Sequence, residues 1–141
     1  MLGEKEEQLF TSALFKRAGF EANVNEHWDI EFKGVKYDVK GAKKIKRSDP
    51  EVNYRYHWVE LKNVSGKPGW LYGKADFFAF ELERYWCLVA REALERFVKD
   101  RVEMVYKDFP LYALYQRKGR KDLISLIPSE DLIFIGEMIP K

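Results

Sequence analysis

Residues 28–44, WDIEFKGVKYDVKGAKK, carry the pattern around which the rest of the chain is organised. Side chains two residues apart in a strand lie on the same face, so a strand through Asp38 and Lys40 points both charges the same way. The Lys33-Gly34 turn folds the preceding strand back beside it and brings Asp29 next to Asp38. The sequence therefore predicts two carboxylates and one ammonium at one end of a small sheet.

These three side chains suit one kind of chemistry. Carboxylate oxygens are ligands that Mg²⁺ and Mn²⁺ prefer. A lysine beside such a metal can position a water or help to deprotonate it. We therefore expect Asp29 and Asp38 to bind the metal and Lys40 to act on the water.

The same residues resemble a known signature. Asp29, a gap of eight residues, Asp38-Val39-Lys40 and Gly41 are similar to the core motif of the PD-(D/E)XK nuclease superfamily, above all to Holliday-junction resolvases and small phage-type endonucleases. The resemblance covers about residues 4–44. It implies a restriction-endonuclease-like α/β (α+β) fold, in which helices flank a mixed β-sheet core. It also implies DNA cleavage with Mg²⁺ or Mn²⁺, the Val39 carbonyl as a further ligand, branched DNA among the substrates, and a homodimer if junctions are cut.

Those families also carry a glutamate on the helix before the sheet. Residues 3–19 have the apolar spacing of an amphipathic helix, with acids near its start. Glu7 matches the family's spacing to the apolar residues that follow, whereas Glu6 lies at the middle of the apolar stripe. We favour Glu7 and keep Glu6 as the alternative, because acids at a helix start also stabilise the helix dipole without any catalytic role.

A rival motif follows in residues 56–64, which alternate as a strand should. Glu60-Leu61-Lys62 is a second acid-x-Lys pair, and Asp38 with Glu60 and Lys62 is a spacing that the wider superfamily tolerates. This alternative needs a long loop to return in the right register. The short turn at Lys33-Gly34 gives the first set its geometry directly, so Asp29, Asp38 and Lys40 are preferred.

Positive charge is concentrated in two short runs, although the net charge is only +2. Both runs lie in predicted loops, where lysine and arginine can contact phosphates without reading sequence. Charge alone is equally consistent with two solvated loops. The residues predicted to bind nucleic acid are Lys43, Lys44, Lys46, Arg47, Arg117, Lys118, Arg120 and Lys121.

The remaining pattern predicts an α/β domain over residues 1–141. Further strands are expected at 20–24, 77–80 and 85–90, a helix at 91–106, and a hairpin of residues 111–116 and 122–127. Ser129 is the expected N-cap of a last helical turn. The glycine-rich segment 66–76 predicts a loop with a turn of helix at residues 70–72. Its Trp70 and Tyr72 either stack on bases or fill the core beneath the loop.

Other chemistries lack their residues. The single cysteine, Cys87, allows no disulfide within the chain, and His27 and His57 do not form a zinc or serine-triad motif. No apolar stretch reaches membrane-spanning length, and the chain start has no apolar signal region, so we expect an intracellular protein without a membrane partner.

Two other function classes stay open. One is a catalytically inactive nucleic-acid-binding module with a nuclease-like fold, which would bind without regard to Mg²⁺. The other is a protein-interaction domain, which would lack the steep salt dependence that phosphate contacts produce.

Overall fold

The computed structural model describes residues 29–141, so the predicted helix over 3–19, the strand at 20–24, and with them Glu6 and Glu7, lie outside the described residues. The described elements run in the order β1 (Ile30–Phe32), β2 (Val35–Lys40), β3 (Tyr56–Lys62), the 3-10 turn η1 (Trp70–Tyr72), β4 (Phe77–Glu81), β5 (Tyr85–Ala90), α2 (Arg91–Arg101), β6 (Leu123–Pro128), α3 (Ser129–Ile135) and β7 (Glu137–Pro140).

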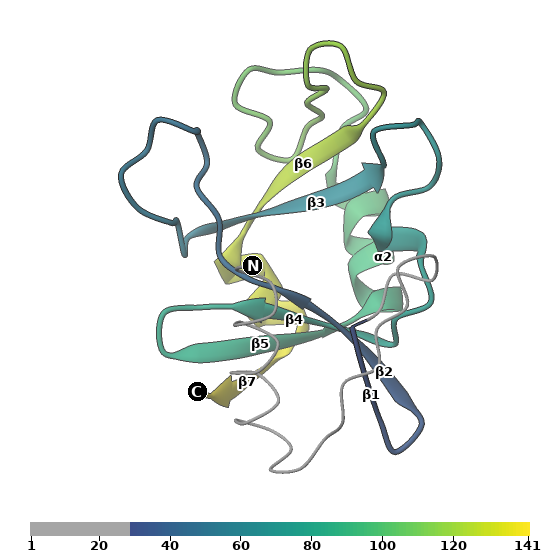
Figure 1. The fold of residues 1–141 in the computed structure, drawn as a ribbon, viewed down its shortest axis with the longest axis vertical. Coiled ribbons are helices and arrows are strands. Elements are labelled where there is room, and N and C mark those ends of the chain that lie inside the picture. The colour runs from purple at the N-terminus through teal and green to yellow at the C-terminus, as the bar shows by residue number, and fades with distance from the viewer. Residues whose placement is uncertain (1–28) are drawn as a thin grey trace.

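The strands form two sheets, which Figure 1 shows one above the other. One sheet has the order β1-β2-β4-β5-β7, with β2 and β4 parallel and the other neighbours antiparallel. The other is an antiparallel ribbon of β3 and β6. The predicted α+β architecture with a mixed sheet and helices beside it is therefore confirmed.

The β1–β2 hairpin follows from its turn residues. Lys33 and Gly34 both have positive φ, of 50° and 80°, as a two-residue type I′ turn requires. The turn pairs Phe32 with Val35 and Ile30 with Tyr37. This register places Asp29 opposite Asp38, as the spacing predicted.

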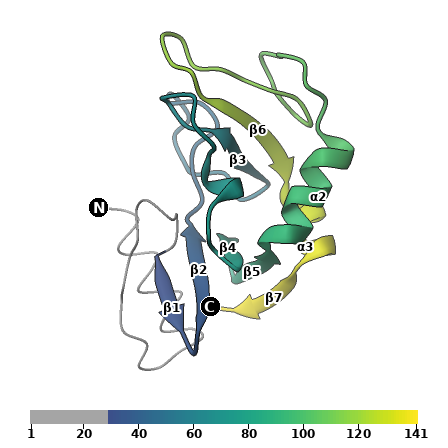
Figure 2. The same ribbon diagram turned by 90° about the vertical axis from the view of Figure 1, so that its right-hand side faces the viewer.

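The core lies between the β3–β6 ribbon and the larger sheet. Alternation along β3 turns His57, Val59 and Leu61 inward, and these side chains are buried. They join a cluster with Phe78 and Phe80 of β4 and with buried leucine and valine of α2, which runs beside both sheets in Figure 2. The opposite face of β3 points away from this core.

Three local predictions were wrong. Helix α2 ends at Arg101, short of residue 106, because the chain turns extended at Val102 and Glu103 N–H donates to Tyr112 O at 2.9 Å. Residues 111–116 contact β6 through isolated bridges and form no strand, since Tyr112 takes a φ of 52° that interrupts an extended ladder. Strand β7, absent from the prediction, pairs with β5.

Two smaller predictions concern short helical segments. Ser129 is the first residue of α3 and not its N-cap, because Oγ donates to Tyr54 O at 2.5 Å and not to the helix. The turn of helix at Trp70–Tyr72 is confirmed.

Neither described helix can cross a membrane. Helix α2 carries charge along its length, and α3 is only 7 residues long. Within residues 29–141, no helix combines the length and the apolar character that a membrane span needs.

Candidate functional site

Asp29 closes the open end of the β1–β2 hairpin. Its backbone N–H donates to Tyr37 O at 2.8 Å, and its Oδ2 accepts the Val39 N–H at 2.8 Å. The side chain therefore folds over the end of β2 and not into solvent. The structure brings Asp29 and Asp38 together in this way.

Asp38 is a buried acid with little compensation. Only 4% of the residue is exposed, and Oδ2 accepts no hydrogen bond. Lys40 Nζ lies 3.2 Å from that oxygen, which makes an ion pair without the direction of a hydrogen bond. Burial raises the pKa of Asp38 well above its usual range; the Asp29 carboxylate raises it further, and Lys40 opposes both.

Lys40 links this corner to the protein surface. Its ammonium lies 4.3 Å from the centre of the Trp70 ring, a cation–π contact. The backbone N–H of Trp70 donates to Glu60 Oε1 at 3.3 Å, and the Trp70 ring packs on Phe78, whose ring centre is 4.9 Å away. The indole is thus a platform for Lys40 that rests on the core, which favours the core interpretation of Trp70 over base stacking.

Gly69 explains why this platform can form. A Cβ at that position would lie 2.5 Å from the Glu60 carbonyl oxygen. Only a glycine therefore lets η1 approach β3 closely enough for Gly69 N–H to donate to Leu61 O at 2.9 Å. Gly69 thus serves a close backbone contact that sets Trp70 beside Lys40.

Few candidate metal ligands come together among the described residues. Asp29 and Asp38 are adjacent, but no group of three or more histidine, cysteine, aspartate or glutamate side chains that could hold a metal occurs among residues 29–141. A third carboxylate was expected from Glu7 or Glu6, outside this range.

The rival set is split between two places. Strand β3 pairs with β6 and not with β2, so it does not return beside Asp38 as that alternative required. Glu60 faces the same cleft as Lys40, whereas Lys62 is exposed and does not line it. The structure therefore does not assemble Asp38, Glu60 and Lys62 into one cluster.

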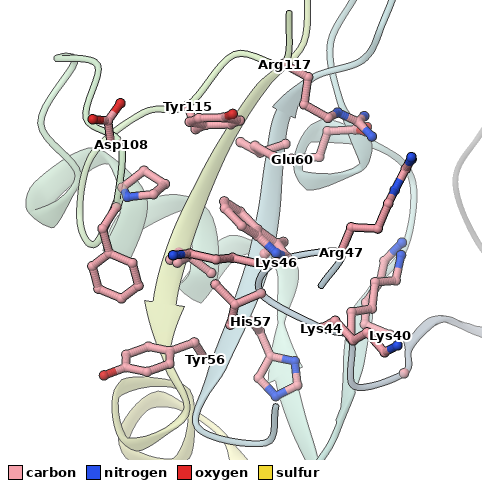
Figure 3. Close-up of a pocket in the computed structure, with 18 of the residues that line it drawn as sticks. Lys40, Lys44, Lys46, Arg47, Tyr56, His57, Glu60, Asp108, Tyr115 and Arg117 are labelled. Carbon is pink, nitrogen blue, oxygen red and sulfur yellow. The ribbon is translucent and has the colours of Figure 1, made fainter. Parts of the chain in front are cut away.

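A cleft of about 1020 Å³ lies over the outer face of the β3–β6 ribbon (Figure 3). Its floor comes from the ribbon, one side from the loop after β2, and the other from the segment before residue 111. Among the residues that line it are Lys40, Lys43, Lys44, Lys46, Arg47, Tyr56, Trp58, Glu60, Trp70, Asp108, Phe109, Tyr115 and Arg117.

The first basic run forms one side of this cleft. Lys44, Lys46 and Arg47 are exposed, and no carboxylate within residues 29–141 forms an ion pair with any of them. The loop is nevertheless ordered by its backbone, since Asn53 N–H donates to Lys43 O at 2.8 Å and Lys46 N–H to Asp49 Oδ2 at 2.9 Å. The backbone that carries these cations is thus held in place, and no ion pair within residues 29–141 neutralises them.

The second basic run contributes one residue to the cleft. Arg117 lines it, although Nε is 2.6 Å from Oδ2 of the fully buried Asp122, which neutralises part of its charge. Lys118, Arg120 and Lys121 are exposed but do not line the cleft. Of the residues predicted to bind nucleic acid, the four of the first run and Arg117 of the second therefore line the cleft.

The aromatic side chains of the cleft other than Trp70 were not predicted as functional. Trp58 and Tyr115 have ring centres 6.4 Å apart, and Tyr56 meets Phe109 edge to face at 5.8 Å. The alternation of residues 56–62 already placed Tyr56 and Trp58 on the face of Glu60. That signal was available, but without a structure nothing showed that this face borders the basic loop.

Two buried groups, His57 in the lining of the cleft and Cys87 in the core on β5, are poor candidates for catalysis. Burial lowers the pKa of His57 to about 4, despite the Glu81 carboxylate and a hydrogen bond to the Glu81 backbone, so the imidazole is neutral. Its Nε2 has no hydrogen-bond partner. Burial raises the pKa of the Cys87 thiol to about 11, which leaves it protonated and unreactive.

No protein-family model, curated protein or solved structure matches this chain. What the site does must therefore be argued from its geometry.

Proposed function

We propose that the protein is a metal-dependent nuclease that hydrolyses phosphodiester bonds in DNA. The observation that carries this proposal is Asp38: a buried carboxylate with a raised pKa and an oxygen that accepts no hydrogen bond, beside a second carboxylate and 3.2 Å from Lys40, which lines a basic cleft. Perturbed acids beside a cleft are a common mark of functional sites.

The carboxylate pair fits a hard divalent cation. Two adjacent acids repel each other, and a cation that binds both relieves the repulsion and the cost of burying Asp38. Asp29, Asp38 and the Val39 carbonyl would hold Mg²⁺ or Mn²⁺, which in proteins is often bound by one or two carboxylates and several waters. Val39 suits this role because its N–H already points to Asp29, and the N–H and C=O of one strand residue share a side. When bound, the metal polarises a phosphoryl oxygen and activates water.

Lys40 completes the site from the chain's own residues. It contacts Asp38 on one side and lines the cleft on the other. An ammonium in this place stabilises negative charge that develops on a phosphate held in the cleft and orients the attacking water. The contact with Trp70 limits its motion, so little reorganisation is needed when the substrate binds.

The cleft supplies the grip on the substrate. Lys44, Lys46 and Arg47 would contact backbone phosphates and release counterions on binding. Such contacts give position without sequence information, which suits a structure-selective or resolvase-like endonuclease. Glu7, with Glu6 as the alternative, would add a carboxylate, and a homodimer would serve if the substrate is a four-way junction. An intracellular setting is part of this proposal.

A second function has one observation in its favour. Lys40 already pairs with Asp38, and the acid is almost wholly shielded from solvent. In a catalytically inactive nucleic-acid-binding module this ion pair would be structural, and the cleft alone would carry the function.

The test is cleavage of labelled single-stranded, duplex, flapped and four-way-junction DNA with and without Mg²⁺. We expect wild type to cut only with Mg²⁺ and Asp38→Asn to lose about 100-fold or more in rate, since a metal contributes several kcal/mol to such reactions. Asp100→Asn, an exposed acid on α2, is the matched control and should cut normally.

Binding of the same substrates separates the two functions. Intact binding without cleavage by wild type on every substrate would reject the nuclease and leave the binding module. Cleavage that Asp38→Asn retains in full would reject this site and require another.

A further inference from the structure

The cleft is built asymmetrically. In Figure 3 Lys40, Lys44 and Arg47 lie on one side, and Asp108 and Tyr115 lie on the other. Within the described chain, the side formed by residues 108–110 brings a carboxylate, a phenylalanine and a proline, and no cation. The loop after β2 therefore brings the cations that attract phosphates, and the facing side brings Asp108, which repels them.

The floor between the two sides is aromatic. Trp58 projects from the outer face of β3, with Tyr115 beside it, and Tyr115 and Phe109 are 36% and 49% exposed. Large rings left partly open on a sunken surface offer flat apolar faces. Bases stack on such faces whatever their identity, because every base has a π-face.

We propose that this cleft binds a single-stranded polynucleotide, with its phosphates along Lys44, Lys46 and Arg47 and its bases stacked on Trp58 and Tyr115. The inference rests on the proposed function, whose substrate class it names. A single nucleic-acid strand can place its phosphates along one side of the cleft and its bases on the aromatic floor, whereas a paired duplex cannot.

A duplex fits this surface poorly for two reasons. Its bases are paired and stacked on each other, so their faces cannot reach Trp58 or Tyr115. Its two backbones would also place phosphates on both sides of the cleft, where Asp108 repels them. Duplex or junction DNA would therefore bind here through an unpaired arm or flap.

The path of the bound polynucleotide connects this cleft to the acidic corner formed by Asp29 and Asp38. Lys40 and Trp70 line the cleft, and Lys40 is 3.2 Å from Asp38 Oδ2. A strand that follows the cations from Arg47 to Lys40 brings a phosphate to the site proposed for hydrolysis. The substrate of that site is then single-stranded where it is cut.

The experiment is fluorescence anisotropy of labelled dT₂₀, rU₂₀ and a 20-base-pair duplex in EDTA, where no metal-dependent cleavage occurs. We expect either single strand, DNA or RNA, to bind at least about 10-fold more tightly than the duplex. Trp58→Leu, which keeps apolar bulk on the floor, should weaken single-strand binding by about 10-fold, a typical loss for one stacked base. Tyr85→Ala removes an exposed ring on β5, outside the cleft, and should change nothing.

Salt dependence separates stacking from charge. The variant with Lys44, Lys46 and Arg47 all changed to Ala should lower the slope of log K against log salt by about 2, since each single-strand phosphate contact contributes about 0.7. Trp58→Leu should leave that slope unchanged. The matched control changes Lys74, Lys99 and Arg96 to Ala, which removes the same charges from exposed positions outside the cleft and should keep the slope.

Two results would overturn the inference: duplex binding as tight as single-strand binding, or a Trp58→Leu variant that melts and binds as wild type does. Because the assay needs no catalysis, its failure is distinct from failure of the nuclease. Single-strand binding that depends on Trp58, without cleavage of any substrate, would support the groove and reject the enzyme. Mg²⁺-dependent cleavage of plain duplex that Trp58→Leu does not affect would support the enzyme and reject single-strand binding in the cleft.

Discussion

The acidic corner and the basic cleft are neighbours with opposite physical states. Asp38 is 4% exposed and its oxygen lacks a hydrogen bond, whereas Lys44, Lys46 and Arg47 are open to solvent. Burial makes the charge of Asp38 costly, and exposure makes the cations inexpensive to keep unpaired. The first arrangement suits a tightly held cation, and the second suits a mobile polyanion.

This difference in exposure sets how strongly a charge in each region interacts with a ligand. A charge in a shielded site acts at close to its full electrostatic strength, while exposed charges act through number and are screened by salt. Lys40 belongs to both regions, since it pairs with Asp38 and lines the cleft.

The largest effect is expected for Lys40→Ala. Loss of a charge that stabilises the reacting phosphate typically costs about 10²–10³-fold in rate, and we expect Mg²⁺-dependent cleavage to fall by that factor. Lys62→Ala is the matched control, because Lys62 also follows an acid by two residues but is exposed outside the cleft. Its rate should stay within about two-fold of wild type.

Initial rates of both variants on one substrate check this pair. Equal losses in Lys40→Ala and Lys62→Ala would move the site toward Glu60 and Lys62. A loss in neither would remove lysine from the mechanism.

His57 tests how dry the inner face of β3 is. Its pKa of about 4 lies below the usual value of 6.5, so between these pH values the unfolded chain binds more protons than the folded one. Stability contributed by neutral His57 is therefore present above pH 6.5 and is lost as the pH falls toward 4. Over this range the free energy of unfolding of wild type should fall by up to about 3 kcal/mol more than that of His57→Gln, because one pKa unit corresponds to about 1.4 kcal/mol.

Urea unfolding at pH 6.5, 5.5 and 4.5 measures this difference. Parallel profiles for wild type and His57→Gln would mean that solvent reaches the imidazole and that the burial of β3 against Phe80 is looser than described.

Gly69→Ala tests the contact that links the two regions through Trp70. The new methyl group would meet the Glu60 backbone at 2.5 Å, and overpacking of this kind costs about 1–3 kcal/mol. The shift of η1 should also move Trp70 away from Lys40 and reduce cleavage. Thermal melting and cleavage rates report the two effects, and a variant unchanged in both would contradict the close approach of η1 to β3.

Local pattern predicted the acidic corner better than the cleft. The corner depends on Lys33-Gly34 and on a period of two across one hairpin, so its residues are close in sequence and short-range rules suffice. The cleft depends on β3 pairing with β6, more than sixty residues later. The sequence of neither segment alone predicts such a non-local pairing.

The same reason accounts for the errors around residues 102–116. The periodicity of α2 continues past Arg101, but Leu114 N–H donates to Val105 O at 2.8 Å and holds that stretch extended. Tertiary contacts here override the local helical preference. Tyr115 and Phe109 reach the cleft through this segment, which is why no sequence pattern marked them.

The smallest expected effect concerns the stability of Asp38→Asn. Because the pKa of Asp38 is raised by burial and by Asp29, the folded state holds its proton more tightly than the unfolded state, and stability declines as the pH rises from about 3.8 through the raised pKa. Asparagine has no such charge, so at pH 7 the variant should melt about 3 °C higher, the scale of about 1 kcal/mol in a domain of this size. Mg²⁺ should raise the melting temperature of wild type and not of Asp38→Asn, because a ligand stabilises only the state that binds it. A variant that loses cleavage but gains stability would separate the function of the corner from its fold, whereas a variant that melts lower would show that the ion pair with Lys40 outweighs the cost of burial.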